Sequence, residues 1–371
     1  MIEGMGTCAQ ASSFLDEGAQ ERERQEARGK RRRANIETSS SLRAFVSRRM
    51  SGCLRASDCL RPGHGTVTRY PVGQGPSVPD RASYFRIGVV QTALCTNLRP
   101  IRKQYRFLYR DNAVRDFGGA GIRIEVRRTP LTWRHRRRFE VLVNGRTRFL
   151  PARFDAVVPH IEWAVSWGLP ELLPDHLQLH SSSLEVNGAG VIFPGHAGSG
   201  KSTLTVGMMT CGWRYLCDEF ALLNMETLSL DPYPRAICIK EGAFPVMRAL
   251  GIPFEARQRF CKGAKGWVDL IHPHRAFGKR NSTLAGVIGR SCPVRFVVFP
   301  QFEPQATPSL MPLTRAEAVL ALHAVCFNLL PDRERALKVL TEAVRGAECY
   351  RLVTGDIHKT CDVLQRVVES R

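Results

Sequence analysis

The chain has 371 residues, which is long enough for two globular domains and a tail. Its hydrophobic content of 43% and charged content of 24% are ordinary for a globular protein. Its formal net charge of +20 suggests a negatively charged partner such as nucleic acid, a membrane surface or a nucleotide, although much of the charge lies early in the chain. No run of about 18 apolar residues occurs, and the N-terminus lacks the apolar core of a signal peptide. We therefore expect no membrane span and a cytoplasmic location.

The cysteines indicate a reducing compartment. The chain has 12 of them, none in a C-x-x-C pair, and they stand singly in apolar surroundings, as Cys217 and Cys238 do. This pattern is typical of buried, reduced thiols and argues against a disulfide scaffold or a zinc site.

Residues 1–82 are rich in Arg, Glu, Ser and Gly and show no sustained apolar period, which predicts a disordered basic tail. The segment, with its basic cluster at 29–33, could bind nucleic acid weakly, but composition favours an inert extension. The sequence does not decide whether this segment belongs to the natural protein.

Residues 83–175 predict a small β-rich subdomain followed by a helix. Asn144-Gly145 is a strong signal for a two-residue hairpin turn. Apolar residues recur at helical spacing over 153–168, and we expect Gly168, Pro170 and Pro174 to end that helix. The predicted strands of this region lie at 85–90, 122–126, 139–143 and 146–150.

Residues 176–371 predict a nucleotide-binding domain. A strand over 177–186 carries His180, and Asn187-Gly188 turns it back into a second strand at 190–194. That second strand leads into G-x-x-x-x-G-K-S at 195–202, and a helix follows, ended near Gly212. A strand, this octet and a helix in succession are typical of a P-loop.

The octet has a clear physical rationale as a phosphate site. Its glycines permit positive φ angles and a close approach of the backbone, whose N–H groups then surround an anion at a helix N-terminus. Lys201 would reach the β- and γ-phosphates of ATP, and the Ser202 hydroxyl would bind Mg²⁺. The candidate nucleotide-binding residues are Gly195, His196, Ala197, Gly198, Ser199, Gly200, Lys201, Ser202 and Thr203.

A second candidate group lies at the end of the short apolar strand 214–217. Asp218 and Glu219 follow it directly, where an acidic residue beside a P-loop can hold Mg²⁺ or orient the attacking hydroxyl. We therefore assign the metal to Ser202 and Asp218.

The rest of the chain predicts further alternating elements. A basic loop at 262–266 is a candidate lid or phosphate clamp, and Arg235 and Lys240 could face the phosphates or sit at a sheet rim. A further basic loop at 134–138 is most simply a solvated surface loop. The predicted strands lie at 221–230, 234–239, 294–299 and 350–353, and the predicted helices at 314–328, 331–345 and 356–369.

The run from His180 through the octet to Asp218-Glu219 resembles the catalytic domain of HPr serine kinase/phosphorylase. It is most similar to the divergent HprK-related kinase A group that accompanies exosortase-type gene clusters. The resemblance covers about residues 84–369. Its further features are Leu216-Cys217-Asp218-Glu219-Phe220, Pro232-Tyr233-Pro234-Arg235, Ile239-Lys240 and Val297-Val298-Phe299-Pro300.

The resemblance implies an α/β P-loop kinase domain of the HPr kinase/PEP carboxykinase type, with a mixed sheet and flanking helices. It also implies ATP and Mg²⁺, a small protein acceptor and a homo-oligomer. His180 would help to position the transferred phosphoryl group, and Glu219, or Asp218, would be the general base. The chain departs from the parent family in having Glu at the base position and Thr203 in place of an acidic residue. The family's downstream metal-binding Glu has no counterpart in a matching context, and the nearest corresponding region, 237–241, offers Lys240 instead.

These observations favour an ATP-dependent kinase that phosphorylates a hydroxyl, with serine as the favoured acceptor and with catalytic residues His180, Lys201, Asp218 and Glu219. The departures keep open an ATP-binding regulator that transfers nothing. The net charge keeps open a P-loop factor that binds nucleic acid.

Overall fold

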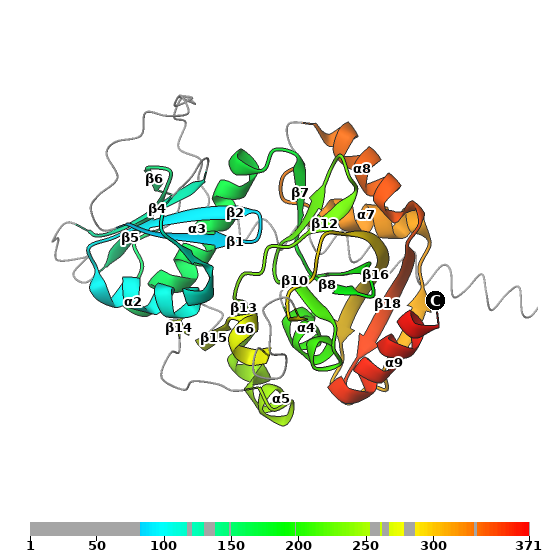
Figure 1. Ribbon diagram of the computed structural model, residues 1–371. Helices are drawn as coiled ribbons and strands as arrows, with labels where there is room; N and C mark the ends of the chain where they lie inside the picture. Colours follow the sequence, from blue (N-terminus) through cyan, green and yellow to red (C-terminus); the bar gives the residue numbers. More distant parts are fainter. Residues whose placement is uncertain are drawn as a thin grey trace, which may run out of the picture. The chain divides into compact units, whose positions relative to one another are not determined.

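The computed structural model describes residues 82–116, 121–129, 138–147, 150–196, 198–252, 260–261, 267–277, 286–329 and 332–370. The predicted tail, except residue 82, the candidate lid at 262–266 and residues 134–137 of the basic loop lie outside the described residues. Within these ranges the protein is a mixed α/β protein whose strands form three sheets flanked by helices (Figure 1). This agrees with the expected fold class at that coarse level.

The first sheet is mixed, because β2 pairs parallel to β4 and its other neighbours pair antiparallel. Helices α2 (Arg99–Leu108) and α3 (Val157–Leu172) contribute to the hydrophobic core of this sheet. In sheet order its strands are β3 (Ala113–Val114), β1 (Ala82–Ile87), β2 (Val90–Cys95), β4 (Ile122–Arg128), β5 (Phe139–Val143) and β6 (Arg146–Thr147).

Two turn assignments in this region had opposite outcomes. The hairpin at Asn144-Gly145 is confirmed, with φ angles of 47° and 77° that suit a two-residue turn between β5 and β6. The single strand predicted over 85–90 is wrong, because Gly88 adopts a φ of 59° and the chain turns there from β1 into β2. The apolar run simply continues through the turn, which hid it from the sequence pattern.

Helix α3 does not stop at Gly168 as predicted but continues to Leu172 with Pro170 inside it. A Cβ on Gly168 would lie 2.8 Å from the Ile122 side chain, so this glycine permits close packing of α3 on β4 rather than ending the helix. Leu169 is fully buried, and its packing explains why the helix continues past a residue that lacks an N–H. Helix α2 was not predicted.

The largest sheet is organised around β9 (Ala189–Pro194), which runs antiparallel to β8 (Ser181–Val186) and parallel to β16 (Cys292–Phe302). The hairpin at Asn187-Gly188 is confirmed by the first of these pairings. The order is β10 (Arg214–Cys217), β8, β9, β16, β12 (Ser229–Asp231), β11 (Ala221–Asn224) and β7 (His176–Leu179), with β18 (Glu348–Thr354) beside β16 and β17 (Ser309–Pro312) beside β18.

Two pairs of helices cover opposite faces of this sheet, as alternate residues of β9 show (Figure 1). Val191 and Phe193 pack in one core with α4 (Lys201–Thr210) and α9 (Ile357–Glu369). Ile192 packs in another core with α7 (Arg315–Val325) and α8 (Arg333–Arg345). These helices confirm those predicted over 314–328, 331–345 and 356–369, and β16 and β18 confirm two predicted strands.

The predicted strand over 221–230 is wrong as a single element, because residues 225–228 form a turn and β11 and β12 pair as a hairpin. The strand predicted over 234–239 begins only at 237, as β13 (Ile237–Lys240). It pairs in a third sheet with β15 (Trp267–Ile271), which also pairs with β14 (Phe260–Cys261). Short helices α5 (Phe244–Ala249) and α6 (Pro273–Phe277) flank these strands in the chain.

Other expectations concern the cysteines, membrane spans and domain boundaries. The cysteines in the described ranges are all free thiols, and most of them are buried. No helix of the described residues is long and apolar enough to cross a bilayer. The boundaries at 82 and 175 stay predictions; one core includes side chains from α3 together with Phe220 and Tyr233.

Candidate active site

The segment between β9 and α4 folds as a tight loop with glycines at its conformationally demanding positions. Gly198 and Gly200 have φ angles of 96° and 89°, and Gly200 is the N-cap of α4. A Cβ on Gly195 would lie 2.7 Å from the Ser199 hydroxyl oxygen, so a larger residue would require the Ser199 side chain to move. The backbone N–H groups at the start of α4 therefore have the geometry of an anion-binding turn.

The Lys201 side chain lies across this loop. Its Nζ donates hydrogen bonds to the carbonyl oxygens of Gly195, at 2.6 Å, and His196, at 2.8 Å. The residue is only 7% exposed. The single positive charge of the loop is thus held beside the backbone that would surround a phosphate.

Ser202 and Asp218 meet at the first turn of α4. The Ser202 Oγ donates a 2.8 Å hydrogen bond to Oδ2 of Asp218, which lies at the end of β10. Asp218 is 1% exposed, and its buried Oδ1 has no hydrogen-bond partner among the described residues. Burial raises the pKa of Asp218, the neighbouring Glu219 carboxylate raises it further, and the Ser202 hydrogen bond and Lys201 oppose that rise.

Glu219 follows in an unusual backbone conformation. Its φ angle is 74°, in the left-handed region that side-chain-bearing residues rarely adopt. The residue is half-buried, directly after the buried Asp218. Such a strained conformation persists only where surrounding contacts hold it in place, and it is found most often at functional sites.

His180 lies at the break between β7 and β8 rather than inside one strand, so the continuous strand predicted over 177–186 is wrong. The chain leaves its pairing with β11 at this residue and begins its pairing with β9. The Gly195 N–H donates to the His180 carbonyl at 3.4 Å, and the imidazole lies 5.4 Å from the Phe327 ring. His180 is thus attached to the first residue of the glycine loop.

Arg235 takes neither of the two orientations that the sequence left open. It is buried and pairs with Glu162 of α3, with Nη2 3.2 Å from the Glu162 carboxylate. Its Nη1 donates to the Ser166 hydroxyl at 3.2 Å, and its guanidinium lies 5.4 Å from the centre of the Phe220 ring. Lys240 is the last residue of β13 and is half-buried.

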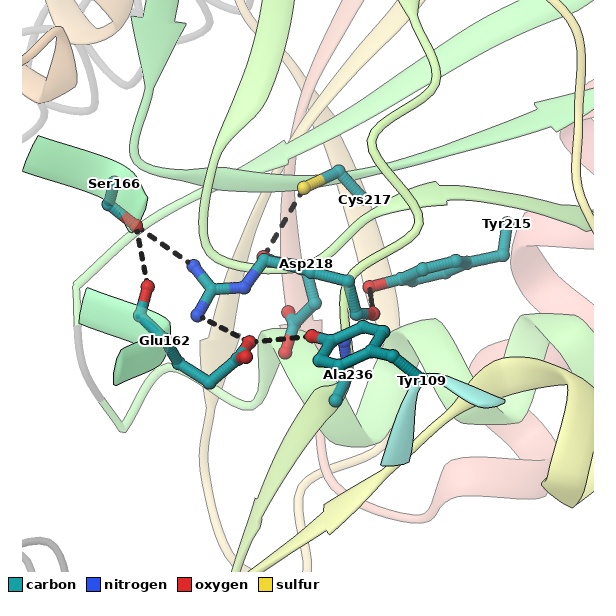
Figure 2. A network of polar contacts seen from close by, with 8 residues as sticks. Tyr109, Glu162, Ser166, Tyr215, Cys217, Asp218 and Ala236 are labelled. Carbon is teal, nitrogen blue, oxygen red and sulfur yellow. Dashed lines mark hydrogen bonds and ion pairs between the residues drawn. The ribbon is translucent and has the colours of Figure 1, made fainter. Parts of the chain in front are cut away.

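Two tyrosines complete this network, which Figure 2 shows at close range. The Tyr109 hydroxyl donates to Glu162 at 2.7 Å and accepts from the Ala236 N–H at 2.9 Å. The Tyr215 hydroxyl, on the strand that leads to Asp218, donates to the Arg235 carbonyl at 3.0 Å. Burial raises the pKa of both tyrosines well above the ordinary value, so both stay hydrogen-bond donors at neutral pH.

The structure therefore brings together Lys201, Ser202, Asp218 and Glu219, and joins His180 to Gly195. Thr203 lies in the first turn of α4 and is half-buried, whereas Ala197 is outside the described residues. The network residues of the first sheet and its helices were missed, because no local motif marks them. Among the described side chains, no cluster of three or more His, Cys, Asp or Glu residues could hold a metal ion. A cation at Ser202 and Asp218 would need further ligands from a phosphate or water.

Comparisons with known proteins add little to this geometry. No protein-family model matches the chain, and no curated protein matches it. One similar solved structure is the HPr(Ser) kinase/phosphatase from Coxiella burnetii, which is 13% identical over 52% of this chain and 99% of that one, with a TM-score of 0.25. Because so low a score does not establish a common fold, we derive the function from this chain's own residues.

Proposed function

We propose that this protein is an ATP-dependent kinase of the HPr serine kinase type. It would transfer the γ-phosphoryl group of ATP to a hydroxyl, that of a serine, on a small protein partner. The observation that carries the proposal is the 2.8 Å hydrogen bond between Ser202 and Asp218 at the end of the glycine loop. It joins the hydroxyl and the carboxylate that an NTP-binding site needs for its metal.

The residues at this point suit Mg²⁺. Asp218 offers a buried carboxylate oxygen that no side chain or backbone group of the described part of the chain binds, and Ser202 offers a hydroxyl oxygen beside it. Mg²⁺ prefers oxygen ligands and is usually held by one or two carboxylates together with substrate phosphates and water. When bound, it would neutralise negative charge that develops on the transferred phosphoryl group.

The side chains of the loop would bind and orient the triphosphate. Lys201 would exchange its hydrogen bonds to the Gly195 and His196 carbonyls for bonds to the β- and γ-phosphate oxygens. The N–H groups over 196–201 would hold the β-phosphate. These are hydrogen bonds to charged groups, which contribute more than neutral ones.

Glu219 would then accept the proton of the acceptor hydroxyl as its oxygen bonds to the γ-phosphorus. The bond between that phosphorus and the β–γ bridging oxygen breaks, and ADP leaves. Asp218 is the alternative base, but its hydrogen bond to Ser202 favours a role at the metal. His180 would contact the γ-phosphate or steady the Glu219 carboxylate from its place beside Gly195.

Calorimetry with Mg·ATP tests the binding step. We expect Lys201→Ala to weaken binding by about 10-fold or more, because it removes a charge-assisted hydrogen bond. Lys338→Ala is the matched control, since it removes an exposed lysine from α8, on the face of the sheet opposite α4. No heat with the wild-type protein would overturn the proposal.

Transfer is tested separately with γ-labelled ATP and candidate small proteins. Glu219→Gln should abolish labelling of the acceptor and preserve Mg·ATP binding. If the wild type binds ATP tightly but labels no partner, and cellular function survives Glu219→Gln but not Lys201→Ala, the chain is an ATP-binding regulator instead.

A further inference from the structure

The sheet order gives the candidate phosphate site two different sides. Asp218 approaches Ser202 from the side of β8 and β10, so the metal and the reacting end of a triphosphate belong on that side. On the other side β9 has a parallel neighbour, β16, and ligands of α/β sheets bind beyond the carboxyl ends of parallel strands. The nucleoside end of a bound nucleotide would therefore extend toward β16.

Phe302 is the last residue of β16, and its Cβ lies close to Gly200 of the glycine loop. A Cβ placed on Gly200 would be only 3.6 Å from the Phe302 Cβ. The phenylalanine is nevertheless 50% exposed, and its chain neighbours Gln301 and Glu303 are exposed polar residues. A half-exposed aromatic side chain thus begins beside the N-terminus of α4, near backbone that would contact the α- and β-phosphates.

The backbone beneath Phe302 is held from several directions. Phe302 pairs with Thr354 of β18, and the Glu303 N–H donates to the Thr354 carbonyl at 2.9 Å. The following loop packs so closely that a Cβ on Gly355 would lie 2.3 Å from the Ala306 carbonyl oxygen. A ring on a rigid strand end loses little conformational freedom when a flat ligand stacks on it.

We propose that Phe302 forms the nucleobase subsite of this protein, with its ring stacked on the base of the bound nucleotide. The inference rests on the proposed function, because it takes the triphosphate to lie in the glycine loop. Stacking on an aromatic side chain is tolerant of base identity, since every nucleobase offers a flat π-face. The subsite therefore adds affinity for nucleotides over inorganic polyphosphates.

The test compares two ligands of the same protein by calorimetry: a non-hydrolysable ATP analogue and tripolyphosphate, each with Mg²⁺. Phe302→Ala should lower the affinity for the ATP analogue by about 10-fold and leave the affinity for tripolyphosphate within about twofold of the wild-type value. Phe302→Trp should preserve or improve nucleotide binding. Met311→Ala, which removes an exposed apolar side chain from β17 of the same sheet, is the matched control and should change neither affinity.

Three results would overturn the assignment. Equal loss of both ligands in Phe302→Ala would mean that the ring supports the loop rather than the base. No loss of either ligand would mean that Phe302 does not contact the nucleotide. If the wild type binds tripolyphosphate no more weakly than the ATP analogue, no nucleobase subsite exists, although the phosphate site of the proposed function survives. Binding of neither ligand would instead refute both proposals.

Discussion

The buried ion pair between Arg235 and Glu162 makes a sharp prediction about stability. The two residues are 3% and 4% exposed, and their charged atoms lie 3.2 Å apart. Arg235→Met would leave the Glu162 carboxylate buried with the Tyr109 hydroxyl but without its cation. Breaking a buried pair from one side typically costs about 3–5 kcal/mol, because the remaining charge has lost water and its partner together.

The double variant Glu162→Gln/Arg235→Met should be more stable than Arg235→Met alone, because the glutamine keeps a hydrogen-bond acceptor for Tyr109 and carries no charge. Urea unfolding followed by tryptophan fluorescence measures these differences. Arg345→Met is the matched control, because it breaks an exposed ion pair in which the Arg345 and Glu342 side chains are 71% and 34% exposed. It should lower the free energy of unfolding by less than about 1 kcal/mol. A similarly small cost for Arg235→Met, or a double variant less stable than the single one, would refute the reasoning.

Three further predictions concern single positions. Gly88→Ala should destabilise the protein far more than Gly145→Ala in thermal melts: both residues have positive φ, but only at Gly88 would a Cβ meet a backbone carbonyl oxygen, 2.0 Å away. Glu219→Gly should be more stable than Glu219→Ala by about 1 kcal/mol, the reverse of the usual order, because φ there is 74°. The hydrogen bond to His176 at 2.8 Å lowers the pKa of Asp231. The ionised Asp231 carboxylate therefore stabilises the fold fully above the ordinary aspartate pKa of about 4, and this contribution is lost as the pH falls through the lowered pKa of the folded protein. The stability gap between wild type and His176→Ala should accordingly narrow in acid.

Local sequence patterns predicted those parts of the fold that local physics determines. The Asn-Gly pairs at 144–145 and 187–188 were confirmed because both residues of such a turn need positive φ, which few other pairs supply. The turn at Gly88 was missed because the apolar pattern continues through it. Gly168 was misread for another reason: Ile122, from a distant part of the chain, occupies the space of its Cβ, and a local pattern contains no information about that neighbour.

The same distinction between local and distant determinants applies to the candidate site. The meeting of Ser202 and Asp218 followed from a general rule, because the ends of β10 and β9 lie at the same edge of the sheet, with only β8 between them. The partner of Arg235 could not be found that way. Glu162 is 73 positions earlier in the chain, on helix α3, which packs against the first sheet. The contact between Arg235 and Glu162 therefore depends on how distant elements pack together.

This packing links Asp218, the candidate metal ligand, to the first sheet and its helices. The Tyr215 hydroxyl binds the Arg235 carbonyl, and the Tyr233 N–H donates to the Leu216 carbonyl at 2.9 Å, so β10 is tied twice to the segment that carries Arg235. That segment is tied in turn to α3 through Glu162. The position of Asp218 therefore depends on side chains that precede residue 176.

A fragment of residues 176–371 tests this dependence. It would remove Glu162 and Ser166, the partners of the Arg235 guanidinium, and it would expose the apolar side chains of Phe220 and Tyr233, which share a core with α3. We expect it to unfold at a markedly lower temperature than the full chain and to bind Mg·ATP more weakly. A fragment that matches the full chain in both measurements would mean that residues 176–371 form an autonomous domain and that the buried network does not support the site.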